Sequence, residues 1–386
     1  MDLTAEQKTL LKEGTAAERK AMELLVTLGT IYEADRLIPV TSAHVSGASY
    51  AIVGEAGLRF LEDFSATARV RVRTTVNPLG MDTEAWEAMG VSADFADRQA
   101  DIAEAYRRMG AEETWSCIPY QIGNRPKLGE HVAWAESSAV VFANSILGAR
   151  TNREGGPAAL ASAVTGLTPN YGLHLTARRE ATARVEVQTA IRGIDYALLG
   201  HHLGRTLGNG VPFLEGVEGS EDEWKAFGAA LSTSSDIDMF HVKGVTPEWE
   251  MAREDACPGR RVGREDLDLA REELLTSDTY SLVAFGSPQL SPRELEEVAG
   301  WMGNLQPKVP VWVFTSRTTA LEAPEAVNQI ERHGGRVWVD TCPEVMPWAE
   351  EGQVGTPSVK AAVYLPKLCR QRVYLGPPEE LLGGGT

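Results

Sequence analysis

Two of the four cysteines occupy positions where a thiol could do chemistry. Cys342 follows an apolar run typical of a buried strand, and Cys117 lies in a loop with Trp, Pro and Tyr around it. Thiolates are soft donors that suit iron, so two loop cysteines could hold an iron–sulfur centre. A buried structural thiol is the other interpretation of each. Cys257 and Cys369 are more typical of structural thiols, and four scattered cysteines do not predict a disulfide scaffold.

A polar loop at 150–156 places two guanidinium groups, Arg150 and Arg153, within seven residues and ends in two glycines. Guanidinium groups bind carboxylates or phosphates through paired hydrogen bonds, and glycines let the backbone approach a ligand. A solvated loop with internal salt bridges fits the same residues. The chain has no P-loop, no dinucleotide-binding fingerprint and no close Cys/His spacing for zinc.

Three polar side chains, Ser42, His44 and Ser46, follow a short apolar segment near residue 40. A histidine among small residues can act as a general acid or base, or simply as a hydrogen-bond donor. The chain lacks the G-x-S-x-G elbow of many serine hydrolases, which argues against a Ser-His-Asp mechanism.

The clearest pattern of secondary structure lies in residues 276–376, where three apolar runs alternate with two helical ones. This pattern predicts a βαβαβ unit with a parallel sheet and right-handed crossovers. Ligands of such sheets bind beyond the carboxyl ends of the strands, so Ser287, Arg317 and Cys342 should share one edge. The expected strands are 281–285, 309–314 and 336–339, and the expected helices are 292–301 and 324–333.

Helical spacing of apolar residues also predicts elements near the N-terminus. Thr4 and Gln7 form a capping-box pattern at the start of an expected helix over 4–30. Further helices are expected at 52–64, 94–109 and 158–164, and a strand at 69–75. We therefore expect an α/β protein with one region over 1–275 and a C-terminal region over 276–386.

The composition and net charge of the chain argue against several classes of partner. The 386 residues are 43% hydrophobic and 24% charged, as in ordinary globular proteins, and carry a net charge of −17. Such a surface repels phosphate backbones and anionic lipids, so neither a nucleic acid nor a membrane is an expected partner. No run is long enough to span a membrane, and the first residues do not resemble a signal peptide. A cytoplasmic location is expected.

Six segments, in this order, resemble the aconitase X family over residues 3 to 376. The segments are Ser42-Ala43-His44-Val45-Ser46-Gly47; Thr75-x-Asn77-Pro78-x-Gly80-Met81-Asp82; Cys117-x-Pro119-Tyr120-x-x-Gly123-Asn124; the run from Gly129 to Ala139; the run from Asn144 to Pro157; and Asp340-Thr341-Cys342.

This resemblance implies an aconitase-type core of several α/β subdomains around a central iron–sulfur cluster. Family members dehydrate small hydroxy acids, either cis-3-hydroxy-L-proline or 5-phosphomevalonate, and we expect a hydro-lyase acting on the former or a related hydroxylated amino acid. Mevalonate 5-phosphate is the alternative substrate. The resemblance is to the large subunit alone, without the swivelling domain, so a small swivelling-domain subunit is the expected partner and the protein a heterodimer.

The resemblance also implies the roles of individual residues. Cys117 and Cys342 would hold the cluster. Catalytic positions would be Ser42, His44, Ser46, Glu136 and Asn152, and substrate-binding positions would be Asn77, Arg150, Arg153, Ser287, Arg317 and Lys360.

One position departs from the family pattern. Family members commonly carry Gly-Cys-Pro-His where this chain has Gly286-Ser287-Pro288-Gln289, so Ser287 stands at the place of a third cysteine ligand. Three explanations compete: a cluster that needs fewer or different cysteines, recruitment of Cys257 or Cys369, or a paralogue with altered chemistry. A non-catalytic binding or scaffolding subunit and a metal-free lyase that uses His44 are the alternatives to an iron–sulfur dehydratase.

Overall fold

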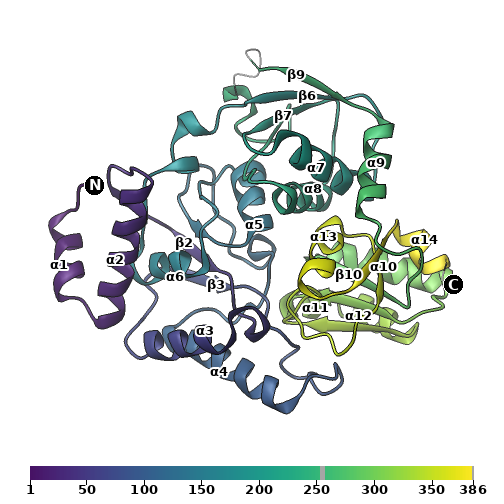
Figure 1. Cartoon of the computed structure of the whole chain (residues 1–386), viewed down its shortest axis with the longest axis horizontal. Helices are drawn as coiled ribbons and strands as arrows, with labels where there is room; N and C mark the ends of the chain where they lie inside the picture. Colours follow the sequence, from purple (N-terminus) through teal and green to yellow (C-terminus); the bar gives the residue numbers. More distant parts are fainter. Residues whose placement is uncertain (253–256, 385–386) are drawn as a thin grey trace.

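The computed structural model describes residues 1–252 and 257–384, and it builds them around four sheets. Every strand pair in the three larger sheets of these residues is parallel, and one two-stranded sheet is antiparallel. The predicted α/β class is therefore confirmed. Figure 1 shows an N-terminal part on the left, a central part at the top right and a C-terminal part at the lower right. Residues 385–386 of the predicted C-terminal region lie outside the described residues.

The N-terminal sheet has the order β3-β2-β4, and β1 pairs with β5 beside it. Its strands are β1 (Leu37–Pro39), β2 (Ser42–Val45), β3 (Arg73–Val76), β4 (Ala133–Trp134) and β5 (Leu167–Pro169). The helices of this part are α1 (Ala5–Glu13), α2 (Ala16–Ile31), α3 (Tyr50–Ser65), α4 (Ala93–Met109), α5 (Ser137–Phe142) and α6 (Gly156–Thr165). Short helical turns lie at Pro119–Gln121, Ala143–Leu147, Gly172–His174 and Thr176–Arg178.

The first predicted helix is two helices. The capping box of Thr4 and Gln7 is confirmed at the start of α1. The chain then leaves the helix at Gly14, and Thr15 opens α2 with a second capping box, in which its side chain accepts from the Glu18 backbone N–H. The prediction of one continuous helix over 4–30 is therefore wrong, because a second helix-start signal interrupts the apolar pattern.

The central part has a four-stranded sheet of order β8-β7-β6-β9 that the sequence analysis did not predict. Its elements are β6 (Ala183–Val187), α7 (Ile194–Leu207), β7 (Pro212–Glu215), α8 (Glu221–Ser234), β8 (His241–Val242), a turn at Trp249–Met251, β9 (Gly259–Val262) and α9 (Arg264–Leu274). Helices α7 and α8 pack closely because α7 carries glycine at the contact. A Cβ atom on Gly200 would lie 2.3 Å from the backbone oxygen of Phe227.

The C-terminal sheet has the order β12-β11-β10-β13-β14, all parallel. The predicted βαβαβ unit is confirmed, and two more strands extend it on the other side of β10. The elements are β10 (Leu282–Leu290), α10 (Pro292–Leu305), β11 (Val311–Thr315), α11 (Arg317–Glu322), α12 (Pro324–Arg332), β12 (Gly335–Val339), β13 (Gln353–Thr356), α13 (Val359–Leu368), β14 (Arg372–Leu375) and α14 (Pro378–Gly383).

Strand β10 is the point at which the strand order of this sheet reverses. One crossover leads from β10 to β11 on one side, and β13 lies on its other side. Such a switch point opens a crevice beyond the carboxyl end of the strand, where ligands of α/β proteins bind. The end of β10 carries Ser287, Pro288 and Gln289.

Among the helices of the described residues, none combines the length and the apolar character that crossing a bilayer demands.

We expect Gly200→Ala to lower the free energy of unfolding by about 1–3 kcal/mol, because the added methyl group meets backbone atoms of α8 that cannot turn aside. Gly300→Ala is the matched control, since Gly300 lies in α10 and nothing is within 4 Å of the added Cβ. That substitution should raise stability by up to about 1 kcal/mol through helix propensity. Urea denaturation of both variants checks the prediction, and equal effects would contradict close packing of α7 on α8.

Candidate functional site

The end of β10 joins the loops of the two candidate cysteines. Cys117 and Cys342 are both buried, at 3% and 4% exposure. The backbone N–H of Gln289 donates to Cys117 Sγ at 3.2 Å, and its side-chain amide donates to the Thr341 carbonyl oxygen at 2.9 Å. One residue at the switch point therefore contacts both cysteine loops, which are distant in the sequence.

A buried carboxylate, Glu344, lies beside Cys342. The Ser287 hydroxyl donates to Glu344 Oε1, and Glu344 Oε2 is 3.8 Å from Cys342 Sγ. The Ser358 hydroxyl in turn donates to the Ser287 carbonyl oxygen. Ser287 lies on the edge predicted for it. Glu344 was not predicted, although its position two residues after Cys342 placed a carboxylate beside a candidate ligand.

Three buried polar atoms around the cysteines have no hydrogen-bond partner within the described residues. They are Tyr120 Oη, Gln289 Oε1 and Thr341 Oγ1. Buried polar atoms in folded proteins are nearly always paired, so each one calls for an explanation. The two hydroxyl groups are free to donate to an acceptor that the protein does not itself provide, such as the sulfide of a cluster.

A buried ion pair forms the other side of the site. Lys360 Nζ, at the start of α13, donates to Glu136 Oε1 at 2.7 Å. Asn77 Nδ2 donates to the other oxygen of Glu136 at 2.7 Å, and the Ser138 hydroxyl donates to Oε1 at 3.0 Å. Both oxygens of the Glu136 carboxylate therefore accept from donors of the protein.

The hydrogen bonds fix the orientation of His44. Because Asn77 uses its amide N–H on Glu136, its Oδ1 faces His44 Nε2 at 2.8 Å and must accept. His44 Nε2 therefore carries the proton, and the neutral ring accepts at Nδ1 from the Thr75 hydroxyl at 2.8 Å. Asn124 Nδ2 donates to the same hydroxyl oxygen at 2.9 Å. This tautomer is assigned from the network.

Burial and neighbouring charges set the pKa values of the ion pair and the histidine. Burial lowers the pKa of His44 to about 4, so the ring is neutral. Burial opposes ionisation of Glu136, but the Lys360 ammonium and the Asn77 amide outweigh it and lower its pKa to about 2. Burial also opposes the charge of Lys360, and the carboxylates of Glu136 and Glu344 still raise its pKa.

In the two thiols, burial and neighbouring charges favour the neutral form. Burial raises the pKa of Cys117 to about 12 and, together with the Glu344 charge, raises the pKa of Cys342 well above its ordinary value. Both thiols are therefore neutral in the protein alone. A bound metal cation reverses this balance and deprotonates a coordinating thiol.

A cavity of about 290 Å³ lies beside the Glu136–Lys360 pair. The charged side chains of Glu136, Glu344 and Lys360 belong to its lining, together with Asn77 and Ser46. Ile52, Tyr364 and Leu368 add larger side chains to the lining. The structure thus gathers five residues that reasoning from the sequence assigned or placed at a site: Ser46, Asn77, Glu136, Lys360 and, one layer behind, His44.

Arg150 and Arg153 do not line this cavity. Arg150 donates to the His174 carbonyl oxygen at 3.0 Å and lies 3.5 Å from Glu248. Arg153 pairs with Asp238 and reaches backbone carbonyl groups near the end of α8. Their guanidinium groups are therefore bound by carboxylates of the protein itself. This agrees with the alternative interpretation of the 150–156 loop, in which its arginines form internal salt bridges.

Three further residues that were predicted for the site make hydrogen bonds or ion pairs outside the cavity. Ser42 accepts from Trp134 Nε1 at 3.2 Å, and Asn152 Oδ1 accepts from the Leu173 N–H at 2.9 Å. Arg317 pairs with Asp340 Oδ2 at 2.6 Å, close behind the Cys342 loop. The structure brings Arg317 to the edge predicted for it, but not into the cavity.

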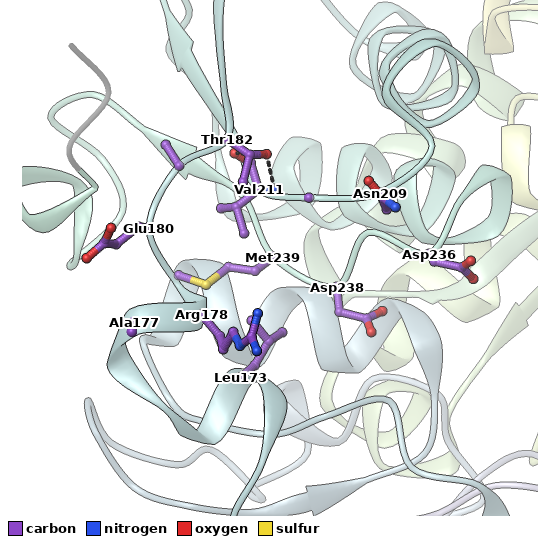
Figure 2. A pocket seen from close by; sticks show the side chains of 12 residues that line it. Leu173, Ala177, Arg178, Glu180, Thr182, Asn209, Val211, Asp236, Asp238 and Met239 are labelled. Atoms are coloured by element: carbon purple, nitrogen blue, oxygen red, sulfur yellow. Dashed lines mark hydrogen bonds between the residues drawn. The ribbon is translucent and has the colours of Figure 1, made fainter. Parts of the chain in front are cut away.

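A larger hollow of about 520 Å³ lies outside the site (Figure 2). The labelled side chains come from residues 173–182 and from loops near 209–211 and 236–239. Asp238, which faces this hollow, is the carboxylate that binds Arg153. None of the predicted site residues lines it.

The donor set at the cysteines fits a cluster. Within residues 1–252 and 257–384, no group of three or more His, Cys, Asp and Glu side chains is arranged around a single metal ion. An iron–sulfur cluster is larger than one ion, so its protein ligands need not converge on one point. Two thiols, a carboxylate and unpaired hydroxyl donors are the chemistry that such a group requires.

We expect Lys360→Met to destabilise the protein by about 3–5 kcal/mol, because it leaves the buried Glu136 carboxylate without its cation. The double variant Glu136→Gln/Lys360→Met should recover part of that loss. Arg59→Met, which breaks an exposed pair with Glu55, is the control and should cost less than about 1 kcal/mol.

The same pair should make stability depend on pH. The pKa of Glu136 in the folded protein is about 2, below its ordinary 4.5, so its contribution is present above pH 4.5 and is lost as pH falls toward 2. Urea denaturation between these pH values should show a steeper loss for the wild type than for the double variant. If the free energy of unfolding changed equally with pH in the wild type and the double variant, an ionised Glu136 would be contradicted.

Three family models together match nearly the whole chain. They are described as the first, second and third domains of aconitase X, and they match residues 1–177, 181–276 and 280–383.

Similar proteins carry dehydratase names. A phosphomevalonate dehydratase large subunit of Methanothermobacter thermautotrophicus is 45% identical over 91% of this chain and 90% of its own length. The protein of that name in Methanocaldococcus jannaschii is 40% identical over the full length of both. A cis-3-hydroxy-L-proline dehydratase of Pseudomonas aeruginosa is 36% identical over 95% of this chain and 67% of its own.

The chain is similar in structure to a crystal structure described as Thermococcus kodakaraensis aconitase X in the holo-form. The match covers 100% of this chain and 100% of that chain, with a TM-score of 0.92 and 40% sequence identity. The resemblance seen in the sequence motifs is confirmed along the whole length of the fold. The chain belongs to the aconitase X family.

Proposed function

We propose that this chain is the large subunit of an iron–sulfur hydro-lyase that removes water from a small hydroxy acid in the cavity beside Cys117 and Cys342. The observation that carries the proposal is a cavity lined by the buried Glu136–Lys360 pair and by Glu344, whose carboxylate contacts the buried Cys342 thiol at the edge of the C-terminal sheet. The relatives are dehydratases, which supports the reaction class.

Cys117 and Cys342 would hold the cluster. When bound, an iron–sulfur cluster supplies a Lewis acid that makes the substrate hydroxyl a better leaving group. The Gln289 N–H fixes the position of Cys117 Sγ, and Gln289 also holds the loop that ends at Cys342.

Lys360 is the cation that this chain presents to the substrate. Its ammonium group lines the cavity and is held by Glu136, so a substrate carboxylate can approach it without a large rearrangement. Asn77 lines the same wall and orients Glu136. With a pKa of about 2, Glu136 remains ionised but is a weak base, which favours a positioning role.

His44 has a positioning role in this proposal. Its Nε2 proton is donated to Asn77, and its Nδ1 lone pair accepts from Thr75. Neither nitrogen is available to a substrate in the cavity, so proton transfer requires another group. This arrangement disfavours the alternative of a metal-free lyase that uses His44 as its base.

A small subunit would complete the site. The relatives that this chain matches over 90–100% of their length are named large subunits. Among the described lining residues, two carboxylates oppose one ammonium group. A hydroxy acid adds at least one negative charge, so further positive groups must come from the cluster and the partner, and the partner is also the source we propose for the catalytic base.

Mevalonate 5-phosphate is the substrate we propose first, because the large-subunit relatives at up to 45% identity carry that name. The cis-3-hydroxy-L-proline expected from the sequence is the second candidate, and the cavity favours it on one point: no arginine among the described residues lines the cavity to bind a phosphate. The substrate-binding roles predicted for Arg150, Arg153 and Arg317 have no support from their contacts.

We expect stoichiometric iron and acid-labile sulfide in anaerobically reconstituted wild-type protein, and loss of both in Cys117→Ala and Cys342→Ala. Cys257→Ala and Cys369→Ala are matched controls and should retain the wild-type content. Iron and sulfide assays with the visible spectrum check this. A wild type without iron and sulfide would contradict the iron–sulfur hydro-lyase and leave the non-catalytic subunit and the metal-free lyase as the remaining alternatives.

We expect the reconstituted chain to dehydrate mevalonate 5-phosphate only after a small subunit of the aconitase X type is added. Water loss creates a double bond, which mass spectrometry of the product detects as a loss of one water. The matched assay uses cis-3-hydroxy-L-proline under the same conditions. Turnover of the proline derivative alone would reverse the order of the two substrates, and turnover of neither would contradict the dehydratase assignment.

A further inference from the structure

The place of the third cysteine is taken by a side chain that cannot easily bind iron. Ser287 is 6% exposed and would have to lose its hydroxyl proton to become an anionic ligand. That proton is donated to Glu344 Oε1 in the structure. A hydroxyl group that already donates to a carboxylate is a poor substitute for a thiolate.

Glu344 is the anionic group closest to that position. Its other oxygen, Oε2, lies 3.8 Å from Cys342 Sγ, so the carboxylate and the candidate thiolate ligand face the same volume. Glu344 is 6% exposed and lines the cavity.

The Glu344 carboxylate meets the Lys360 ammonium group only beyond ion-pair distance. Among the described residues it forms no ion pair, because the nearby Lys360 ammonium is bound to Glu136. A buried charge without a partner is costly, and buried charges in folded proteins are usually paired or bind a metal. A cation at the cysteine loops would remove this cost.

From these contacts we propose that Glu344 is an oxygen ligand of the cluster, in the role of the missing third thiolate. The inference rests on the proposed function, since it requires that a cluster is bound at Cys117 and Cys342. Carboxylate oxygen is an established iron ligand in proteins. Ser287 then acts through Glu344, because ligating carboxylates are themselves held by hydrogen bonds from neighbouring groups.

The decisive comparison is between Glu344→Gln and Ser287→Ala in the full chain after anaerobic reconstitution. Glu344→Gln keeps the size of the side chain but removes the anionic oxygen. Glu351→Gln is the matched control, because it makes the same change on an exposed side chain of the following loop. The measurements are iron and sulfide per chain, the rate of iron loss to a chelator, and the Mössbauer and electron paramagnetic resonance spectra.

Glu344→Gln should change the Mössbauer signal of one class of iron and speed iron loss at least tenfold. Ser287→Ala should keep the cluster and its oxygen-ligated iron signal, with about a tenfold faster loss of iron, as expected when a hydrogen bond to a ligand is removed. Glu351→Gln should match the wild type. A purely structural role of Glu344 would lower the melting temperature without moving the spectra.

Two results would overturn the assignment. Wild-type spectra and iron retention in Glu344→Gln would exclude Glu344 as a ligand, and a larger spectral change in Ser287→Ala than in Glu344→Gln would assign the ligand to Ser287. If Glu344→Gln does not fold, Glu344→Asp replaces it, since a displaced carboxylate must still shift the signal of the iron it binds. A wild type that binds no iron would instead refute the cluster and the proposed function together.

Discussion

The buried contact between Glu136 and Lys360 is the constraint on which the site depends. Glu136 caps the first turn of α5 in the N-terminal part, and Lys360 lies in the first turn of α13 in the C-terminal part. Removing both charges from water costs several kcal/mol per ion, and replacing such pairs with apolar residues often stabilises proteins. The pair is therefore poorly explained by stability alone. It joins two helices from distant parts of the chain at one small cavity, and it sets the direction of the hydrogen bonds that run from Glu136 through Asn77 and His44 to Thr75.

The C-terminal sheet contributes a second constraint, the reversal of strand order at β10. Because β11 and β13 lie on opposite sides of β10, a crevice opens beyond the end of that strand. The N-terminal part packs against this end, with Cys117 against Gln289 and Leu79 bridged to Thr341. The cysteines thus meet at an interface between two parts, each with its own sheet, and Figure 1 shows α5 and α13 where these parts approach each other.

These two constraints explain which features could be predicted from the sequence. The βαβαβ pattern has long apolar strands with regular spacing, so the edge that holds Ser287 and Cys342 followed from sheet geometry alone. The strands of the central sheet have only two to five residues, too few for a clear apolar pattern even where β6 alternates, and their sheet was not predicted. Arg150 and Arg153 were assigned to a ligand because their partners, Glu248 and Asp238, lie about 90 residues away in that same unpredicted region. A guanidinium group in a sequence does not reveal which carboxylate will bind it.

The charge of the cavity indicates where substrate specificity must arise. The described residues supply one ammonium group and two carboxylates to the lining, so the charge of the lining is unfavourable for an anion unless a further cation is present. If Glu344 binds the cluster, the iron neutralises the negative charge of its carboxylate. The positive charge of Lys360 is in turn partly neutralised by Glu136. What this chain then offers is a metal site with one positioned cation, which suits the hydroxyl and carboxylate that all the candidate substrates share. For the parts in which these substrates differ, a phosphate or a pyrrolidine ring, the small subunit proposed as the partner is the source of recognition that we propose.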